Sequence, residues 1–277
     1  MSSRYSDLDR PPLDIGGLTR ALVTPGSLWT AIEVIEEAES TNALVADRAR
    51  AGADSGLVVI AESQTSGRGR LDRTWSAPPR SGLTMSMLIR PDDIDASRWS
   101  WLPLLAGLAA AAAVRRQAGV EAGLKWPNDV MVAERKLGGL LVERVETPGH
   151  PPAAVIGLGL NVSLRADELP VLTATSLALE GADTTDRSLL ARAVLRNLEG
   201  LFTDWSRHGG DARHGLRTAY LQACMTIGQF VRVDISNAEP VEGRAVGIDV
   251  SGRLLVRSRG AQHVFGAGDV LHLRPAT

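Results

Sequence analysis

The chain has 277 residues, of which 44% are hydrophobic, and its formal net charge is -2. This length allows one large domain or two smaller ones, and the near-neutral charge argues against a protein that binds nucleic acid through its overall electrostatics. A single cysteine, Cys224, excludes an internal disulfide and fits a reducing compartment, and no apolar run approaches membrane-spanning length. We therefore expect a soluble, cytoplasmic protein without a membrane partner.

Residues 1–28 are polar and contain several prolines, so they predict an N-terminal extension with one short helix near Leu18 and Leu22. Alternation of apolar and polar residues over 29–35 then predicts the first strand. The regular part of the fold is expected to start there.

Three polar residues, Ser40, Thr41 and Asn42, stand where the next helix is expected to begin. Ser40 or Thr41 is a suitable N-cap, because a hydroxyl oxygen can accept a hydrogen bond from the first turn. The same groups can also bind a polar ligand, since a helix N-terminus presents unpaired N–H groups. The sequence leaves two interpretations open: a cap alone, or a cap that also contacts a ligand.

A buried strand is expected over 57–62, and the segment 67–75 after it contains three arginines and two glycines. Glycine lets the backbone approach a ligand closely, and the guanidinium group of arginine matches two oxygens of a carboxylate or phosphate at once. Gln64, just before the segment, adds an amide that both donates and accepts. The pattern indicates either a loop that wraps a small anion or a solvated surface turn.

The next elements are a strand over 82–89 and a buried helix over 99–118 that ends at Gly119. Only two of the 30 basic residues are lysines, Lys125 and Lys136, and they stand close together. An ammonium group binds phosphate as a point charge without a planar fork. The pair therefore indicates an anion site, or else it reflects codon bias alone.

A turn is expected after Pro127, and a strand over 135–143 follows it. Gly138 and Gly139 lie inside that strand, where glycine often marks the close approach of a ligand or another backbone.

A further buried strand over 153–160 ends at Asn161. Gly157 and Gly159 resemble the start of a dinucleotide fingerprint, but Val162 stands where its third glycine belongs. The sequence also lacks a Walker motif, so a bound nucleotide would use neither standard phosphate loop.

Helices are expected over 187–205 and 216–223, and short alternating strands with glycine turns predict a small β-barrel from residue 226 onward. The sequence therefore predicts an α+β protein in three parts. These are an N-terminal extension at 1–28, a mixed-sheet domain with flanking helices at 29–224, and the barrel at 225–277.

Four of these stretches together resemble the biotin protein ligase family: 40–42, 67–75, 125–129 and 136–143. Gly157, Gly159 and Asn161 form a fifth, weaker match, and all five follow the family's order. The chain departs from the family pattern at Asp72, where the family usually has glycine. A carboxylate there is able to pair with a neighbouring arginine.

The resemblance implies a class II synthetase-like catalytic domain that binds biotin and ATP, followed by an SH3-like β-barrel. It implies that biotin and ATP react to biotinyl-5′-AMP and pyrophosphate, with Mg²⁺ at the phosphates, and that biotin then passes to a lysine of a biotin carboxyl carrier domain of an acyl-CoA carboxylase. No resident metal site is expected. No DNA partner is expected either, because residues 1–28 are too short for the DNA-binding domain of bifunctional members.

Site roles follow from the residues that match the family's motifs. The resemblance makes Lys136, Arg68 and Asp129 catalytic, although Asp129 is alternatively a turn-forming residue only. Biotin and its adenylate are expected to contact Ser40, Thr41, Asn42, Gln64, Gly67, Arg68, Gly69, Arg70, Trp75, Lys125, Asn128, Lys136, Gly138, Gly139, Gly157, Gly159 and Asn161.

Three other functions compete with this one. A lipoate or octanoate ligase or transferase of the same superfamily also joins a carboxylic acid to a carrier lysine. A nucleic-acid-binding regulator would use the arginines and the barrel, and a biotin-binding protein would use the site without catalysis. The arginine segment and the Lys125–Asp129 stretch favour the biotin ligase.

Overall fold

The computed structural model describes residues 9–70, 73–146, 149, 151–235 and 238–273. Asp72, which the sequence singles out as a departure from the family pattern, lies outside these residues. Among the described helices, none is both long and apolar enough to cross a membrane.

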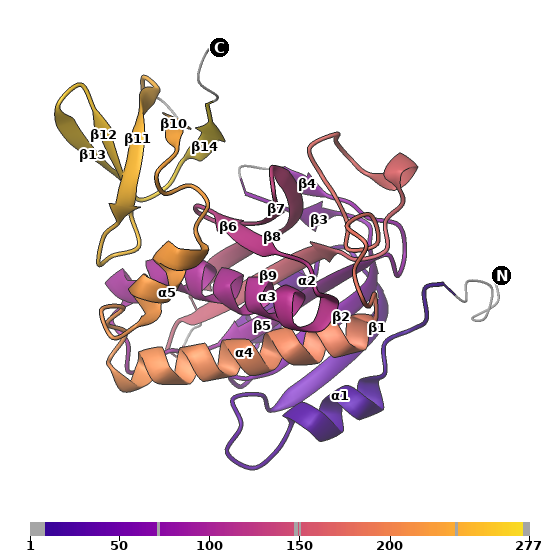
Figure 1. The fold of residues 1–277 in the computed structure, drawn as a ribbon. Coiled ribbons are helices and arrows are strands. Elements are labelled where there is room, and N and C mark those ends of the chain that lie inside the picture. The colour runs from indigo at the N-terminus through magenta and orange to yellow at the C-terminus, as the bar shows by residue number, and fades with distance from the viewer. Residues whose placement is uncertain (1–8, 71–72, 147–148, 150, 236–237, 274–277) are drawn as a thin grey trace.

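The centre of the molecule is a mixed seven-stranded sheet with the strand order β1-β2-β5-β9-β8-β7-β6 (Figure 1). The first two strands pair in parallel, and every other neighbouring pair in the sheet is antiparallel. Each strand expected from the sequence is present, with small differences at its ends. The strands are β1 (Ala31–Ala38), β2 (Leu57–Gln64), β5 (Gly82–Ile89), β6 (Ala122–Lys125), β7 (Asp129–Val132), β8 (Arg135–Val145) and β9 (Ala153–Asn161).

Helices cover both faces of this sheet, as Figure 1 shows. On one face α1, α3 and α4 enclose the larger hydrophobic core, and on the other face α2 packs on a smaller one. These helices are α1 (Ile15–Leu22), α2 (Thr41–Arg50), α3 (Leu102–Ala118) and α4 (Arg187–Arg207), and the short α5 (Leu216–Ala223) follows α4. The single helix expected over 99–118 is divided, because a 3₁₀ turn, η1 (Ala96–Trp101), precedes α3, whose first turn contains a proline.

The pleat of the sheet decides which side chains reach which core, because successive residues of a strand point to opposite faces. On β5, Leu83 and Met85 pack into the larger core. Thr84 and Ser86 point the other way, toward α2, and Ser86 bonds to Asn42 of that helix. The α2 face of the sheet is therefore apolar at one end and polar at the other.

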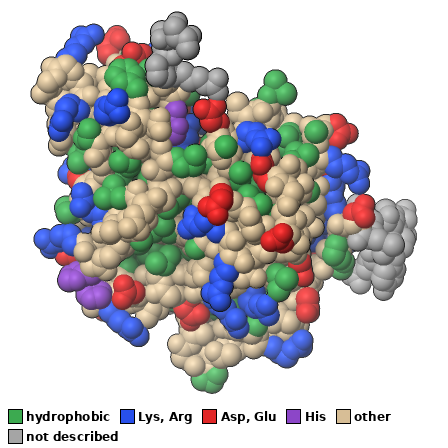
Figure 2. Space-filling view, viewed as in Figure 1, with side chains coloured by type: hydrophobic (Ala, Val, Ile, Leu, Met, Phe, Trp, Pro, Cys, Tyr) green, Lys and Arg blue, Asp and Glu red, His purple; other side chains and the backbone are tan. Residues whose placement is uncertain are grey.

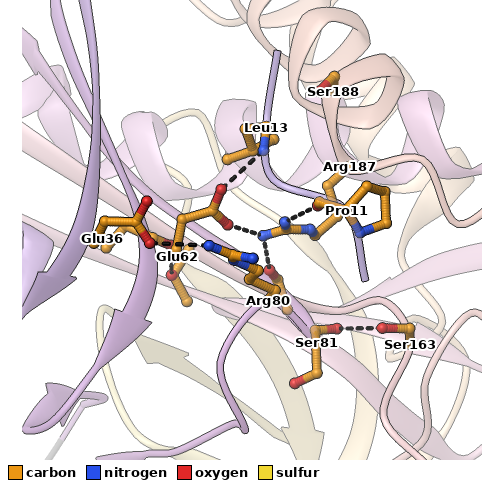
Figure 3. A network of polar contacts seen from close by, with 12 residues as sticks. Pro11, Leu13, Glu36, Glu62, Arg80, Ser81, Ser163, Arg187 and Ser188 are labelled. Carbon is orange, nitrogen blue, oxygen red and sulfur yellow. Dashed lines mark hydrogen bonds and ion pairs between the residues drawn. The ribbon is translucent and has the colours of Figure 1, made fainter. Parts of the chain in front are cut away.

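A buried ion pair ties the N-terminal extension to the sheet and to α4 (Figure 3). The Glu62 carboxylate of β2 lies 2.6 Å from Nη1 of Arg187, and both side chains are less than 5% exposed. Glu62 also accepts from the backbone N–H of Leu13, and Arg187 donates to the carbonyl of Pro11. Because both charges are paired and hydrogen-bonded, their burial is tolerated.

The last part of the chain forms a second, five-stranded antiparallel sheet with the order β13-β12-β11-β10-β14, here called the C-terminal sheet. Two tryptophan indoles of the main body donate to its backbone: Trp101 to the carbonyl of Val250 and Trp126 to that of Gly252. The short alternating strands expected here are confirmed. They are β10 (Phe230–Asp234), β11 (Val241–Ile248), β12 (Leu254–Ser258), β13 (Ala261–Phe265) and β14 (Asp269–His272).

Candidate functional site

A cavity of about 720 Å³ opens on the α2 face of the main sheet. Its wall combines the first turn of α2, the ends of β2 and β9, the turn between β6 and β7, and the edge of the C-terminal sheet. Three glycines of the lining, Gly139, Gly157 and Gly159, lie close to the side chains of Lys136, Asn42 and Trp75, respectively. The missing side chains of these glycines thus make room for three side chains that line the cavity.

One part of the lining, here called the polar wall, is a network of buried and partly buried hydrogen bonds. The Ser40 hydroxyl caps α2 by accepting from the N–H of Ala43. Gln64 Oε1 accepts from both the backbone N–H and the hydroxyl of Thr41, at 2.7 and 3.0 Å. Ser40 therefore caps the helix, and both Ser40 and Thr41 line the cavity.

Asn42 occupies the centre of the polar wall. Its Nδ2 donates to a carboxylate oxygen of Glu143 at 2.7 Å, and its Oδ1 lies 2.6 Å from the hydroxyl of Ser86. A Cβ on Gly157 would lie 2.1 Å from Asn42 Oδ1, so glycine at this position makes room for the amide. An ordered set of donors and acceptors of this kind is suited to a ligand with several polar atoms.

A second part of the lining, here called the cationic wall, contains the arginine segment and both lysines. Arg70 Nη1 donates to Asn128 Oδ1 at 3.1 Å, and Lys136 Nζ lies 2.7 Å from Asp129 Oδ1. The backbone of Lys136 is fixed as well, because its N–H donates to Thr173 and its carbonyl accepts from Thr175.

Burial changes the ionisation of two of these cations. It lowers the pKa of Arg70 and of Lys125 below their ordinary values, and the carboxylates of Asp129 and Asp269 offset part of this effect. Lys136 also disfavours the charged form of Lys125. Positive charge crowded into a half-buried site is stabilised by an anion, so the cationic wall is suited to a phosphate or carboxylate ligand.

The arginine segment forms a small hairpin of β3 (Gly67–Arg68) and β4 (Thr74–Trp75). Arg68 is exposed at its rim, whereas Arg70 is partly buried inside the cavity. Arg73 forms an ion pair with Asp269 of the C-terminal sheet.

Trp75 lies against Gly159, where a Cβ would come within 2.5 Å of the indole ring. Its Nε1 is buried, and no hydrogen-bond partner for it is found in the described part of the chain. A buried donor beside a cavity is available to a ligand.

All but two of the residues assigned from the sequence line this one cavity. Gly67 and Gly138 do not, because a Cβ on Gly67 would meet the carbonyl of Trp75 and one on Gly138 would meet Gly159 and Leu160. The others are Ser40, Thr41, Asn42, Gln64, Arg68, Gly69, Arg70, Trp75, Lys125, Asn128, Asp129, Lys136, Gly139, Gly157, Gly159 and Asn161.

Sequence reasoning missed several residues of the site. Thr84 and Ser86 alternate with apolar residues on a buried strand, and that period-two polarity was the available signal. Asp269 gave no local signal at all. Asn161, which is expected from the sequence to contact biotin or its adenylate, is buried and donates to the carbonyl of Thr175.

Charge on the surface is mixed. On the face drawn in Figure 2, blue Lys and Arg side chains are interspersed with red Asp and Glu side chains. The drawn face therefore carries no continuous basic surface of the kind typical of nucleic-acid-binding proteins.

Residues 34–161 match the model of the biotin/lipoate A/B protein ligase family, and residues 226–273 match that of the biotin protein ligase C-terminal domain. The biotin–[acetyl-CoA-carboxylase] ligase of Mycobacterium tuberculosis is 40% identical over 269 residues, which are 96% of this chain and 97% of that protein. The bifunctional ligase/repressor BirA of Bacillus subtilis is 31% identical over 82% of this chain and 70% of its own length.

The fold is also similar to solved structures. The biotin protein ligase from Aquifex aeolicus in complex with biotin and ATP superposes with a TM-score of 0.74 at 25% identity, covering 89% of this chain and all of that one.

Proposed function

This chain belongs to the biotin/lipoate A/B protein ligase family, and from that premise we propose that it is a biotin protein ligase that makes biotinyl-5′-AMP and transfers biotin to a protein lysine. The observation that favours this activity is the lining of the cavity, which combines a polar wall around Asn42 with a cationic wall that contains Arg70 and Lys136. Such a cavity fits a molecule that is polar at one end and anionic at the other. The similar proteins from Mycobacterium tuberculosis and Aquifex aeolicus are named as biotin ligases, which favours biotin over lipoate.

In the first step a carboxylate oxygen of biotin bonds to the α-phosphorus of ATP, and the bond from that phosphorus to the bridging oxygen breaks to release pyrophosphate. Two anions must approach each other, so the step requires fixed positive charge at the reacting oxygens. Arg70 and Lys136 supply it, because hydrogen bonds to Asn128 and Asp129 fix their positions. Arg68 approaches the same oxygens from the rim.

In the second step the amine of the acceptor lysine attacks the carbonyl carbon of the biotinyl group, and AMP leaves. Asp129 has two roles that fit its place: it orients Lys136 through the ion pair, or it accepts the proton of the attacking amine. Trp75, packed on Gly159, keeps water from one side of the mixed anhydride, which hydrolyses when water reaches it.

Mg²⁺ is the ion expected with ATP, and it prefers phosphate and water oxygens with one or two carboxylates. The chemistry of the cavity fits such an ion, because Asp129 and Asp269 line its cationic wall. Each of these carboxylates is paired with a cation of the chain, so we propose that Mg²⁺ is bound mainly through the phosphates of ATP. There it would neutralise part of the triphosphate charge.

We propose the following organisation and partner. Residues 1–28 are an N-terminal extension, 29–224 the catalytic domain and 225–277 an SH3-like C-terminal domain. The relatives from Mycobacterium tuberculosis and Paracoccus denitrificans are named as ligases of acetyl-CoA carboxylase. On this basis the acceptor is a biotin carboxyl carrier domain of an acyl-CoA carboxylase.

The proposal is tested by mass spectrometry of the purified protein after incubation with Mg-ATP and biotin, lipoate or octanoate in separate samples. We expect biotinyl-AMP in the biotin sample only. A lipoyl or octanoyl adenylate instead would establish the superfamily alternative, and biotin bound without any adenylate would indicate a binding protein without catalysis.

A further inference from the structure

The C-terminal sheet contributes to the cavity that the catalytic residues line. Asp269 begins β14 at the edge of that sheet, and Val270 and Leu271 after it also line the cavity. The turn before β14 uses Gly268 at a φ of +148°, in the region that favours glycine. This turn brings a carboxylate of the last part of the chain to the cationic wall.

Asp269 pairs there with Arg73 of the arginine segment, although the two residues are 196 positions apart in sequence. The Asp269 side chain is 29% exposed and that of Arg73 is 62% exposed. Asp269 also favours the charged forms of Arg70 and Lys125, which burial disfavours. Its carboxylate therefore faces three cations of one wall.

The position of Arg73 is coupled to that of Arg70 through the backbone. The N–H of Gly69 donates to the carbonyl of Arg73 at 2.7 Å, and the N–H of Arg73 donates to the carbonyl of Arg70 at 3.2 Å. Arg70 in turn contacts Asn128 inside the cavity. A group that fixes Arg73 consequently also fixes the guanidinium that we assign to the reacting oxygens.

Two other carboxylates that line the cavity have partners outside the arginine segment. Asp129 pairs with Lys136, and Asp234 pairs with Arg232 on its own strand. The Asp269–Arg73 pair joins the C-terminal sheet to the arginine segment.

We propose that Asp269 is a positioning residue for adenylate retention: through Arg73 it holds the arginine hairpin against the cavity, so that biotinyl-AMP stays bound until the acceptor lysine arrives. This inference rests on the proposed function, because it assumes that the cavity makes the adenylate. It gives the C-terminal sheet a part in the chemistry that is additional to its packing.

The test measures the release of preformed biotinyl-AMP from the full-length protein, after rapid dilution into excess unlabelled adenylate. Asp269→Asn and Arg73→Ala should each release it about two- to fivefold faster, the size expected for a partly exposed ion pair. The double variant Arg73→Ala with Asp269→Asn should release the adenylate no faster than the faster single variant, because both changes remove the same ion pair. A control, Glu242→Gln, removes an exposed charge from β11 of the same sheet and should leave release unchanged.

Raising the salt concentration gives a second measure. Release should rise in both the parent and Asp269→Asn, because salt also screens the cations that hold the phosphate, but it should rise more in the parent, in which salt screens the Arg73–Asp269 pair as well. The inference is overturned if Asp269→Asn releases the adenylate at the parental rate, or if the double variant releases it as fast as the product of the two single effects. If the parent forms no biotinyl-AMP, the proposed function itself fails, so the two failures are distinguishable.

Discussion

The two walls of the cavity are built differently. The polar wall consists of side chains from α2, β2, β5 and β8, and their hydrogen bonds are buried or partly buried. The cationic wall consists of an exposed hairpin, a turn and the edge of the C-terminal sheet, and ion pairs connect them. Buried networks of satisfied polar groups fix one arrangement, whereas exposed ion pairs contribute little and are screened by salt.

This difference in burial suggests a different role for each wall. The rigid polar wall is suited to recognising the substrate that stays bound through both steps. The less buried cationic wall is suited to the groups that change, since pyrophosphate and AMP must leave from it. Changes in the first wall should therefore alter substrate affinity, and changes in the second should alter adenylation and retention.

The largest effect is expected at Lys136. Lys136→Ala removes a charge-assisted contact worth about 1.5–3 kcal/mol, so biotin-dependent exchange of pyrophosphate into ATP should fall roughly 10- to 100-fold. Lys136→Arg should also lower the exchange, because a guanidinium does not fit the ammonium site beside Asp129. Near-normal exchange in both variants would remove Lys136 from the mechanism.

The next prediction concerns the polar wall. Gly157→Ala places a methyl group 2.1 Å from Asn42 Oδ1 and should displace the amide from its network. Biotin affinity, measured by calorimetry, should fall about 5- to 100-fold, equivalent to roughly 1–3 kcal/mol for buried polar groups left unsatisfied. Gly200→Ala is the matched control, because no atom lies within 4 Å of its added Cβ on α4. Equal affinity of the two variants would contradict the account of this wall.

Two arginines of the hairpin should differ in effect. Arg70 is partly buried and bonded to Asn128, whereas Arg68 lies exposed at the rim. Both alanine variants should release biotinyl-AMP, which then biotinylates nearby lysines indiscriminately. The release should be several-fold faster from Arg70→Ala than from Arg68→Ala. The assay is biotinylation of an unrelated protein present in the reaction. The reverse order would show that the rim, not the interior, retains the adenylate.

The smallest expected effect is a shift in pH dependence. Burial lowers the pKa of Lys125 below its ordinary value of 10.5, so its positive charge is lost at a lower pH than that of a free lysine. Adenylation should decline as the pH rises through that pKa. Lys125→Arg keeps the charge and should move the alkaline limb of the exchange rate to higher pH. If the alkaline decline of the exchange rate stays at the same pH in Lys125→Arg, Lys125 does not control that decline.

The same Lys125 shift also affects stability. A lysine whose folded pKa is lowered binds its proton less tightly in the folded state, so the unfolded state binds more protons between the two pKa values. The free energy of unfolding should therefore rise with pH as the pH passes upward through that interval. Lys125→Met, which removes the titrating group, should lack this rise in denaturant unfolding.

Much of the fold followed from the sequence because local rules agree with one another. Alternation on β5 and helical spacing on α4 survive in the structure, and Ser40 caps α2 as its residue type suggested. The ends of elements were less accurate. The residues 99–118 form η1 and then α3, because tertiary packing and a proline decide where the regular helix begins.

The site was predictable where its residues are adjacent in sequence and unpredictable where they are not. The 40–42 and 67–75 stretches are recognisable from their composition. Gly138 and Gly139 point to opposite faces of the sheet, and which of them lines the cavity is known only from the observed strand register. The pairing of Arg73 with Asp269 joins two distant segments, so no local pattern reveals it. Long-range contacts of this kind come from packing between parts of the fold.

The central claim is that the cavity activates biotin with ATP. The most direct measurement is biotin-dependent incorporation of labelled pyrophosphate into ATP by the purified protein, compared with the same reaction containing lipoate. The account predicts incorporation with biotin and none above background with lipoate. No incorporation with biotin, or equal incorporation with both acids, would contradict it.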